Sequence, residues 1–178
     1  MDTSLKYISD ISKNIPLEEF EISFLVLTCM IVIIFAFTQD ICKLRFRILL
    51  SILIEYCFLV LSYTVIFRNT GEKRLYNLTP FWSYNAVAKY HEHFYFHEYV
   101  MNILLGTPIG FLLFYIFSKR KWLKVFVFGL VFSCIIEFLQ YLLMKGLCEF
   151  DDVFHNTLGC MLGYGIGYLF LLIIKKKI

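Results

Sequence analysis

Long apolar runs, each about the length that crosses a bilayer, alternate along the chain with short polar segments. The hydrocarbon core of a membrane takes about 20 residues of helix. The pattern therefore predicts an all-α, polytopic membrane helix bundle with about five transmembrane helices. The predicted spans are 22–38, 48–67, 99–117, 122–144 and 153–174. Residues 1–21 are predicted to form an external segment, and 22–178 the membrane domain.

Composition agrees with this pattern. Residues of the set AVILMFWYC make up 60% of the 178, charged residues make up 17%, and the mean hydropathy is +0.72. A soluble domain is about 45–50% apolar and about 25% charged. These values exclude a disordered chain, a coiled coil and an ordinary cytosolic enzyme, and we expect no nucleic-acid partner. The six cysteines are scattered without a C-x-x-C pair and are interpreted as inert packing residues.

The distribution of basic residues predicts the orientation. Ten of the 17 Lys and Arg residues lie in three short segments, 39–47, 118–124 and 175–177. Short cytoplasmic loops of membrane proteins are enriched in Lys and Arg. These three segments are therefore predicted to lie in the cytoplasm, with the N-terminus outside and the C-terminus inside. Segment 68–98, which is predicted to be the only long loop, then lies outside.

Polar residues gather at the outer end of the predicted bundle. Ionisable and amide side chains are costly in hydrocarbon and mark functional sites by default. On the predicted topology, seven of them reach the same depth: Asn102, Glu137, Gln140, Glu149, Asp151, Asp152 and Asn156. We expect them to form one site, and the alternative is hydrogen bonding between helices with no further role. Glu55 lies nearer the middle of its span, where a structural partner and a role in a site are both open.

Two further patterns have a structural interpretation. Gly159, Gly163 and Gly167 recur at intervals of four, which predicts close backbone packing of the last span against the third or fourth. The long loop also carries His91, His93 and His97. An H-E-x-x-H metal motif is not completed there, so these histidines are interpreted as part of an aromatic interfacial loop rather than a metal site.

Four motifs over residues 60–170 resemble, in order, those of the VanZ-like family. They are N-L-T-P-F at 77–81, N-I-L-L-G-T-P-I-G-F at 102–111, a Ser-Glu-Gln pattern at 133–140 and D-D-V-F-H-N-T-L-G at 151–159. The residues that match the family are Asn77, Pro80, Phe81, Asn102, Pro108, Gly110, Ser133, Glu137, Gln140, Asp152, Asn156, Thr157 and Gly159.

Three positions depart from the family pattern. Gly106 replaces an aromatic residue, Glu149 replaces an Asp, and Gly146 replaces an Arg, with only Lys145 beside it. Arg binds carboxylates and phosphates through two parallel hydrogen bonds, whereas Lys acts as a point charge. An activity that relied on this Arg would therefore be altered here. The resemblance implies a multi-pass protein of the bacterial cell membrane, in a family whose namesake is associated with resistance to the glycopeptide teicoplanin.

Three functional hypotheses follow. In the first, the protein is not an enzyme and binds or shields a lipid-linked peptidoglycan precursor. The binding residues would be Asn77, Asn102, Gln140, Glu149, Asp151 and Asn156. In the second, it is an intramembrane enzyme acting on a polyprenyl- or phospholipid phosphate. Glu137 and Asp152 would then be catalytic, with Mg²⁺ held by Glu149, Asp151 and Asp152.

The third hypothesis is a transporter in which Glu137 carries a proton. It is disfavoured because the chain shows no internal repeat, which many transporter folds have. Membrane lipids are the expected partners under all three hypotheses. The sequence does not indicate an oligomeric state, and no cofactor other than Mg²⁺ is expected.

Overall fold

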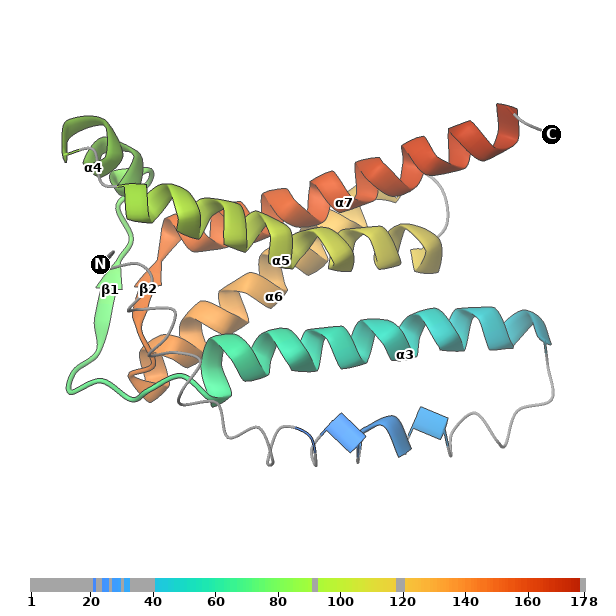
Figure 1. Ribbon diagram of the computed structural model, residues 1–178, viewed down its shortest axis with the longest axis horizontal. Coiled ribbons are helices and arrows are strands. Elements are labelled where there is room, and N and C mark those ends of the chain that lie inside the picture. The colour runs from blue at the N-terminus through green and yellow to red at the C-terminus, as the bar shows by residue number, and fades with distance from the viewer. Residues whose placement is uncertain are drawn as a thin grey trace. The chain divides into compact units, whose positions relative to one another are not determined.

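The structure is a computed structural model that describes residues 41–90, 93–117 and 121–176, together with residues 21, 24–25, 27–29 and 31–32 (Figure 1). The chain divides after Asn69 into two compact units, Met1–Asn69 and Thr70–Ile178. The first predicted span, 22–38, lies largely outside the described residues.

The first unit contains one long apolar helix. Helix α3 (Ile41–Leu61) continues into a π-helical turn, η1 (Ser62–Ile66). Together they give a candidate membrane span at Leu44–Ile66, close to the predicted 48–67. Within this unit the hydroxyl of Thr28 donates a hydrogen bond of 3.2 Å to Glu55 Oε1. Glu55 therefore has a structural partner.

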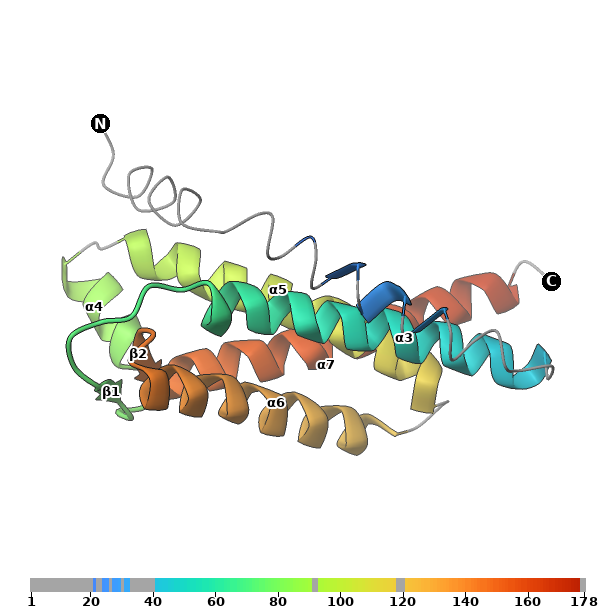
Figure 2. The ribbon, with the colours of Figure 1, turned by 90° about the horizontal axis from the view of Figure 1, so that it is seen from below.

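The second unit contains three helices that are long and apolar enough to cross a membrane. They are α5 (His93–Phe117), α6 (Trp122–Leu143) and α7 (Phe150–Lys176). Helix α7 packs against both of the others, and Figures 1 and 2 show it running beside α5 and α6. With α3 this makes four candidate spans in the described part of the chain. Large apolar side chains such as Leu162 and Leu169 are exposed along them, as expected where lipid replaces water.

Glycines let α5 and α7 approach backbone to backbone. A Cβ built on Gly106 or Gly110 would lie 2.3 or 1.8 Å from a backbone oxygen of α7. A Cβ on Gly159 or Gly163 would lie 2.3 or 1.9 Å from a backbone oxygen of α5. The predicted packing of the glycine stripe against the third span is confirmed at these two positions. Gly106, which departs from the family motif, is one of the glycines that permit the contact.

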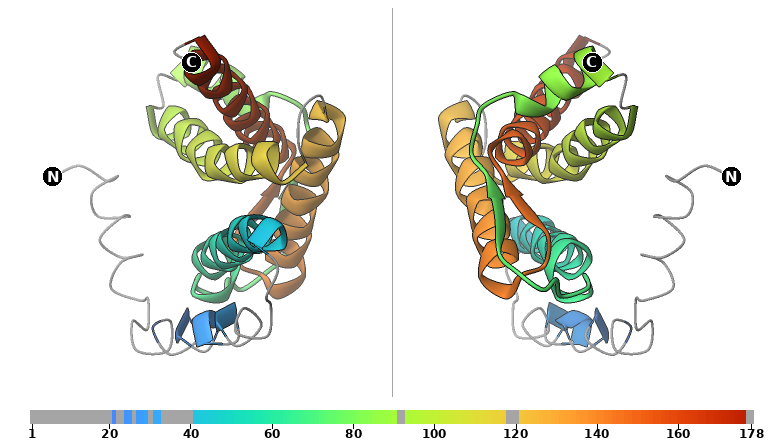
Figure 3. Two further views of the ribbon diagram at one scale, coloured as in Figure 1. Left: turned by 90° about the vertical axis from the view of Figure 1, so that its right-hand side faces the viewer. Right: turned by 90° about the vertical axis from the view of Figure 1, so that its left-hand side faces the viewer.

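The predicted long loop, 68–98, contains regular secondary structure. It contains a short strand, β1 (Leu75–Asn77), helix α4 (Trp82–Tyr90) and the first turns of α5. Strand β1 pairs in parallel with β2 (Leu147–Glu149), which lies between α6 and α7 (Figure 3). Backbone groups that pair in a ladder satisfy each other's hydrogen bonds. The pairing thereby brings segment 75–81 to the start of α7.

Two helices begin earlier than predicted. Helix α7 begins at Phe150 rather than at residue 153, so Asp151 and Asp152 lie in its first turn and not in a loop. Carboxylates in a first turn are stabilised by the positive end of the helix dipole, which explains the earlier start. Helix α5 begins at His93 rather than at residue 99. The side chain of His97 is exposed, and His91 lies outside the described residues.

Candidate functional site

Polar side chains are buried at one end of the second unit, where the first turns of α7 meet β2, α4, α5 and α6. Polar groups removed from water are costly unless they are hydrogen-bonded. They include Ser83, Ser133, Glu137, Gln140, Glu149 and Asp151, each 8% exposed or less. With the partly buried Asn102, Asp152 and Asn156, we refer to these nine residues as the polar cluster.

Asp151 joins the start of α7 to the start of α4. Its carboxylate accepts the backbone N–H of Phe81 at 2.6 Å, the backbone N–H of Ser83 at 3.3 Å and the Ser83 hydroxyl. The first N–H groups of a helix have no partner within that helix. Asp151 therefore caps α4 from a segment about 70 residues away in the chain. Phe81 adopts a positive φ of 57° at this turn.

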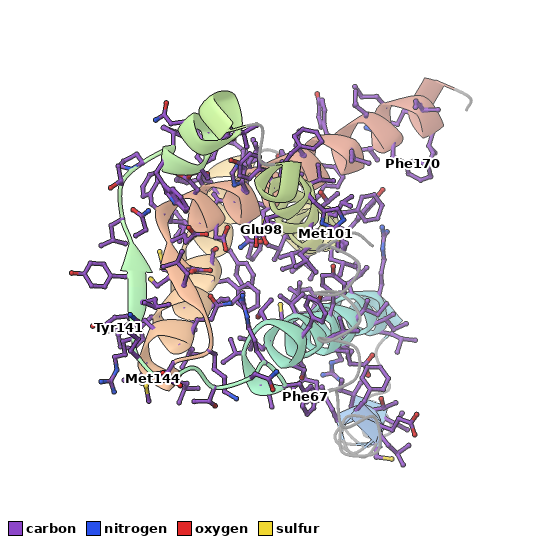
Figure 4. All side chains as sticks on the ribbon, turned by 60° about the vertical axis from the view of Figure 1, so that its left-hand side comes forward. Phe67, Glu98, Met101, Tyr141, Met144 and Phe170 are labelled. Carbon is purple, nitrogen blue, oxygen red and sulfur yellow. The ribbon has the colours of Figure 1, made fainter. Side chains whose placement is uncertain are left out.

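Glu149 connects β2 to α4 and α6. Its Oε1 accepts the indole N–H of Trp82 at 2.9 Å, and its backbone N–H donates to Glu137 Oε2 at 2.9 Å. Burial, together with the nearby charges of Asp152 and Glu98, raises the pKa of Glu149 to about 8. Glu98 lies in the first turns of α5, where Figure 4 labels it. At neutral pH most of the Glu149 carboxyl groups therefore hold a proton.

Two amide side chains connect α7 to its neighbours. Asn102 on α5 donates to Asp152 Oδ1 at 2.7 Å, and Asn156 on α7 donates to the Ser133 hydroxyl on α6 at 3.1 Å. Six of the predicted site residues thus form hydrogen bonds that connect elements of the second unit. They are Asn102, Glu137, Glu149, Asp151, Asp152 and Asn156.

The two remaining predicted binding residues are placed differently. Gln140 is buried one turn along α6 from Glu137, with 3% of its surface exposed. Asn77 pairs with Glu149 in the register of the two strands. Its side chain, however, accepts the backbone N–H of Thr79 at 3.1 Å. This is an Asx turn, which shapes the segment between β1 and α4.

The described residues include no group of three or more His, Cys, Asp and Glu side chains arranged to hold a metal ion. The three acids predicted as magnesium ligands instead accept hydrogen bonds from Trp82, Ser83 and Asn102, on α4 and α5. Gly146, where the family has an Arg, adopts a φ of 147°. An L-residue would be strained there, so the glycine suits this connection. Metal binding by the acids stays a prediction.

Three aromatic rings beside the polar cluster were not predicted. The Tyr84 hydroxyl lies 2.6 Å from His155 Nε2. The ring of Tyr99 stacks on both, with centroids 4.8 Å from Tyr84 and 4.5 Å from His155. His155 lies within the 151–159 motif, one helical turn after Asp151, and that spacing is a signal that sequence reasoning could have used. Tyr84 carries no such signal. We call these three residues the aromatic trio.

The aromatic trio forms part of the wall of a cavity of about 360 Å³. The cavity lies between α4, α5 and α7, and we call it the α4–α5–α7 cavity. Outside the trio its lining is apolar and comes from Val87, Phe96, Val100, Ile103 and Leu158. Desolvation inside this site raises the pKa of the Tyr84 hydroxyl, and the charge of Asp151 raises it further. The Tyr84 hydroxyl therefore keeps its proton.

A sequence model of the VanZ/LLP1 family matches residues 22–172. This chain belongs to the VanZ/LLP1 family. It is 32% identical over 109 residues to a protein named Protein VanZ from Enterococcus faecium, an alignment that covers 60% of this chain. The alignment spans 62% of the length of that relative. No solved structure matches the chain significantly. Family membership confirms the resemblance, and the four apolar spans agree with a membrane protein.

Proposed function

We propose that this protein lies in the bacterial cell membrane and binds or shields a lipid-linked cell-wall precursor at the outer leaflet. The proposal includes a link to resistance against teicoplanin-type glycopeptides, which derives from the family resemblance. Membership of the VanZ/LLP1 family and four candidate membrane spans support it. The orientation that puts the polar cluster at the outer face derives from the basic residues of the short loops.

The observation that carries the proposal is the cavity of about 360 Å³ beside the polar cluster. A lipid-linked precursor joins a hydrocarbon chain to a head that carries sugar hydroxyls and peptide amides. An apolar cavity with a few convergent polar groups is the usual form of a ligand site. Here the apolar cavity suits the hydrocarbon chain of the lipid. The amides of Asn102 and Gln140, which donate and accept hydrogen bonds, and the carboxylate of Asp152, which accepts them, suit the head.

A second candidate is an intramembrane enzyme that acts on a polyprenyl- or phospholipid phosphate. One observation favours it, because Glu149, with a pKa of about 8, is an acid able to exchange a proton near neutral pH. Its backbone N–H donates to Glu137, the predicted general acid or base, so the two carboxyl residues are neighbours. Release of phosphate from an added polyprenyl phosphate by the purified protein would favour this candidate over binding alone.

Lipid that co-purifies with the protein tests the binding proposal. We expect mass spectrometry of the wild type in mild detergent to find a polyprenyl-linked lipid enriched over the bulk membrane extract. The enrichment should be lost in Glu137→Gln, which keeps the shape of the side chain and removes its charge. Glu72→Gln, an exposed acid outside the polar cluster, is the matched control and should behave as the wild type.

A wild type whose lipids match the bulk membrane would refute the binding proposal. Loss of enrichment in Glu72→Gln as well would show that the effect is not specific to the site. The same variants, expressed in a teicoplanin-sensitive host, test the resistance link. We expect the wild type and Glu72→Gln to raise the inhibitory concentration of teicoplanin, and Glu137→Gln to leave it at the value of the empty host.

A further inference from the structure

Phe81, the last residue of the N-L-T-P-F motif, has a backbone conformation that phenylalanine rarely adopts. Its φ of 57° lies in the left-handed region. Glycine and asparagine enter this region readily, whereas a bulky residue there is an outlier that its surroundings must hold in place. The backbone N–H of Phe81 donates to Asp151 Oδ1 at 2.6 Å, which fixes the turn. A strained position that carries an aromatic ring indicates a role for that ring.

The ring of Phe81 packs edge-to-face on the start of α7. Its centroid lies 6.1 Å from that of Phe150 and 5.3 Å from that of Phe154. These contacts do not bury the rings, because Phe81 remains 44% exposed and Phe150 and Phe154 are each 38% exposed. We call these three residues the phenylalanine surface. It joins the turn before α4 to the first turns of α7, which Figure 1 shows at the same end of the second unit.

The phenylalanine surface continues an exposed apolar row along α7. Residues four apart lie on one side of a helix. From Phe150 and Phe154 the row goes on through Leu158, Leu162 and Ile166, which are 36%, 48% and 50% exposed. All five residues belong to the candidate membrane span Phe150–Lys175, where an exposed apolar side chain faces hydrocarbon rather than water. This continuity favours membrane lipid as the partner of the phenylalanine surface.

The length of α7 indicates the depth of this surface. The hydrocarbon core takes about 20 helical residues. Counted back from Lys175, which follows the apolar run, about 20 residues reach the turn of α7 that carries Phe154. Phe154, with the ring of Phe81 against it, therefore lies at the boundary between hydrocarbon and head groups. Elements at this boundary bury Phe and Leu side chains about 5–10 Å into the membrane. Leu78, three residues before Phe81, is 62% exposed and suits the same use.

We propose that the turn at 78–81 inserts into the leaflet at this end of the bundle, with Leu78 and Phe81 in contact with lipid acyl chains. The turn then anchors α4 to the membrane, whereas the sequence pattern placed all of segment 68–98 in an external loop. The contact is with hydrocarbon, so it selects no head group. The inference goes beyond the proposed function and does not depend on it, because the partner is the bulk membrane lipid rather than a bound precursor.

Spin labels on single cysteines test the inference in the full-length, otherwise Cys-less protein, reconstituted in vesicles of phosphatidylglycerol and phosphatidylcholine. Oxygen concentrates in hydrocarbon and a nickel chelate stays in water, so the logarithm of the ratio of their relaxation effects reports the depth of each label. We expect positive values at Leu78→Cys and Phe81→Cys. Leu162→Cys, further along the exposed row of α7, should give a larger positive value. Glu72→Cys, an exposed position of the same segment, is the matched control and should give a negative value.

A second pair of variants tests whether the Phe81 ring holds the turn in the membrane. Asparagine suits the left-handed conformation, so Phe81→Asn should keep the turn while removing its apolar contact with lipid. We expect the depth value of a label at Leu78→Cys to shift toward that of Glu72→Cys in this background. Phe81→Tyr, which keeps the ring, should leave the value unchanged.

Three results would contradict the inference. Labels at Leu78→Cys and Phe81→Cys that respond to the nickel chelate as Glu72→Cys does would place the turn in water. Labels that respond to neither reagent would show that protein, either a second copy or another segment of this chain, covers the phenylalanine surface. An unchanged depth value in Phe81→Asn would show that the ring does not hold the turn. None of these results bears on the lipid-enrichment test above, so the failure of either proposal is recognisable by itself.

Discussion

A single methyl group added at Gly163 should separate α5 from α7. Its Cβ would lie 1.9 Å from the carbonyl oxygen of Thr107 and 2.8 Å from the backbone nitrogen of Phe111. Real Cβ atoms essentially never approach another heavy atom closer than 3.0 Å. Both atoms in the way belong to the backbone of α5, so no side chain can rotate to make room. The two helices must therefore part by about an ångström or more.

The free-energy cost of moving the helices apart is partly offset by the higher helix propensity of alanine. Overpacking a well-packed core costs about 1–3 kcal/mol, and we expect the upper part of that range because the obstacle is backbone. Replacing glycine by alanine inside a helix recovers about 1 kcal/mol of helix propensity. The net loss for Gly163→Ala is then about 2 kcal/mol. For a chain of this size, that lowers the melting temperature by about 4–8 °C.

The assay is thermal unfolding in detergent, with Gly165→Ala on the same helix as the control. A Cβ at Gly165 meets no atom within 4 Å, so this variant should melt at or slightly above the wild-type temperature. Gly110→Ala, whose Cβ would lie 1.8 Å from the Cys160 carbonyl oxygen, should repeat the loss from the α5 side. Equal melting temperatures for Gly163→Ala and Gly165→Ala would refute the close backbone contact.

Three further predictions concern the acids and the topology. The pKa of Glu149 rises from 4.5 to about 8 on folding, so the folded state holds a proton that the unfolded chain loses, and the melting temperature should fall as the pH rises from about 5 to 8. A pH series on Glu149→Gln should lack most of this fall, and an unchanged slope would count against the buried proton. Mg²⁺ should not raise the melting temperature of the wild type or of Asp152→Asn. A rise in melting temperature seen only in the wild type would support Mg²⁺ binding by these acids. On intact cells with a Cys-less background, Asn85→Cys should react with an impermeant thiol reagent and a cysteine added after Ile178 should not, while the reverse labelling would invert the predicted orientation.

The sequence by itself determined the class of fold and most of the polar cluster. Apolar length is a local property, so the runs that became α3, α5, α6 and α7 were recognisable without any tertiary contact. The cost of polar groups in hydrocarbon singled out residues such as Glu137 and Asn102 for the same local reason. The glycine stripe also predicted close helix packing, because a spacing of four places small residues on one helical face.

Only the tertiary structure decided what the polar residues contact. Asp151 caps a helix that begins about 70 residues earlier, and β1 pairs with a strand that lies beyond two membrane-spanning helices. Neither pairing leaves a local periodicity in the sequence, because each partner is a single residue or a three-residue strand. Tyr84 and His155 meet for the same reason, since the cap and the strand pair together bring α4 against α7. The α4–α5–α7 cavity therefore exists only in the folded chain.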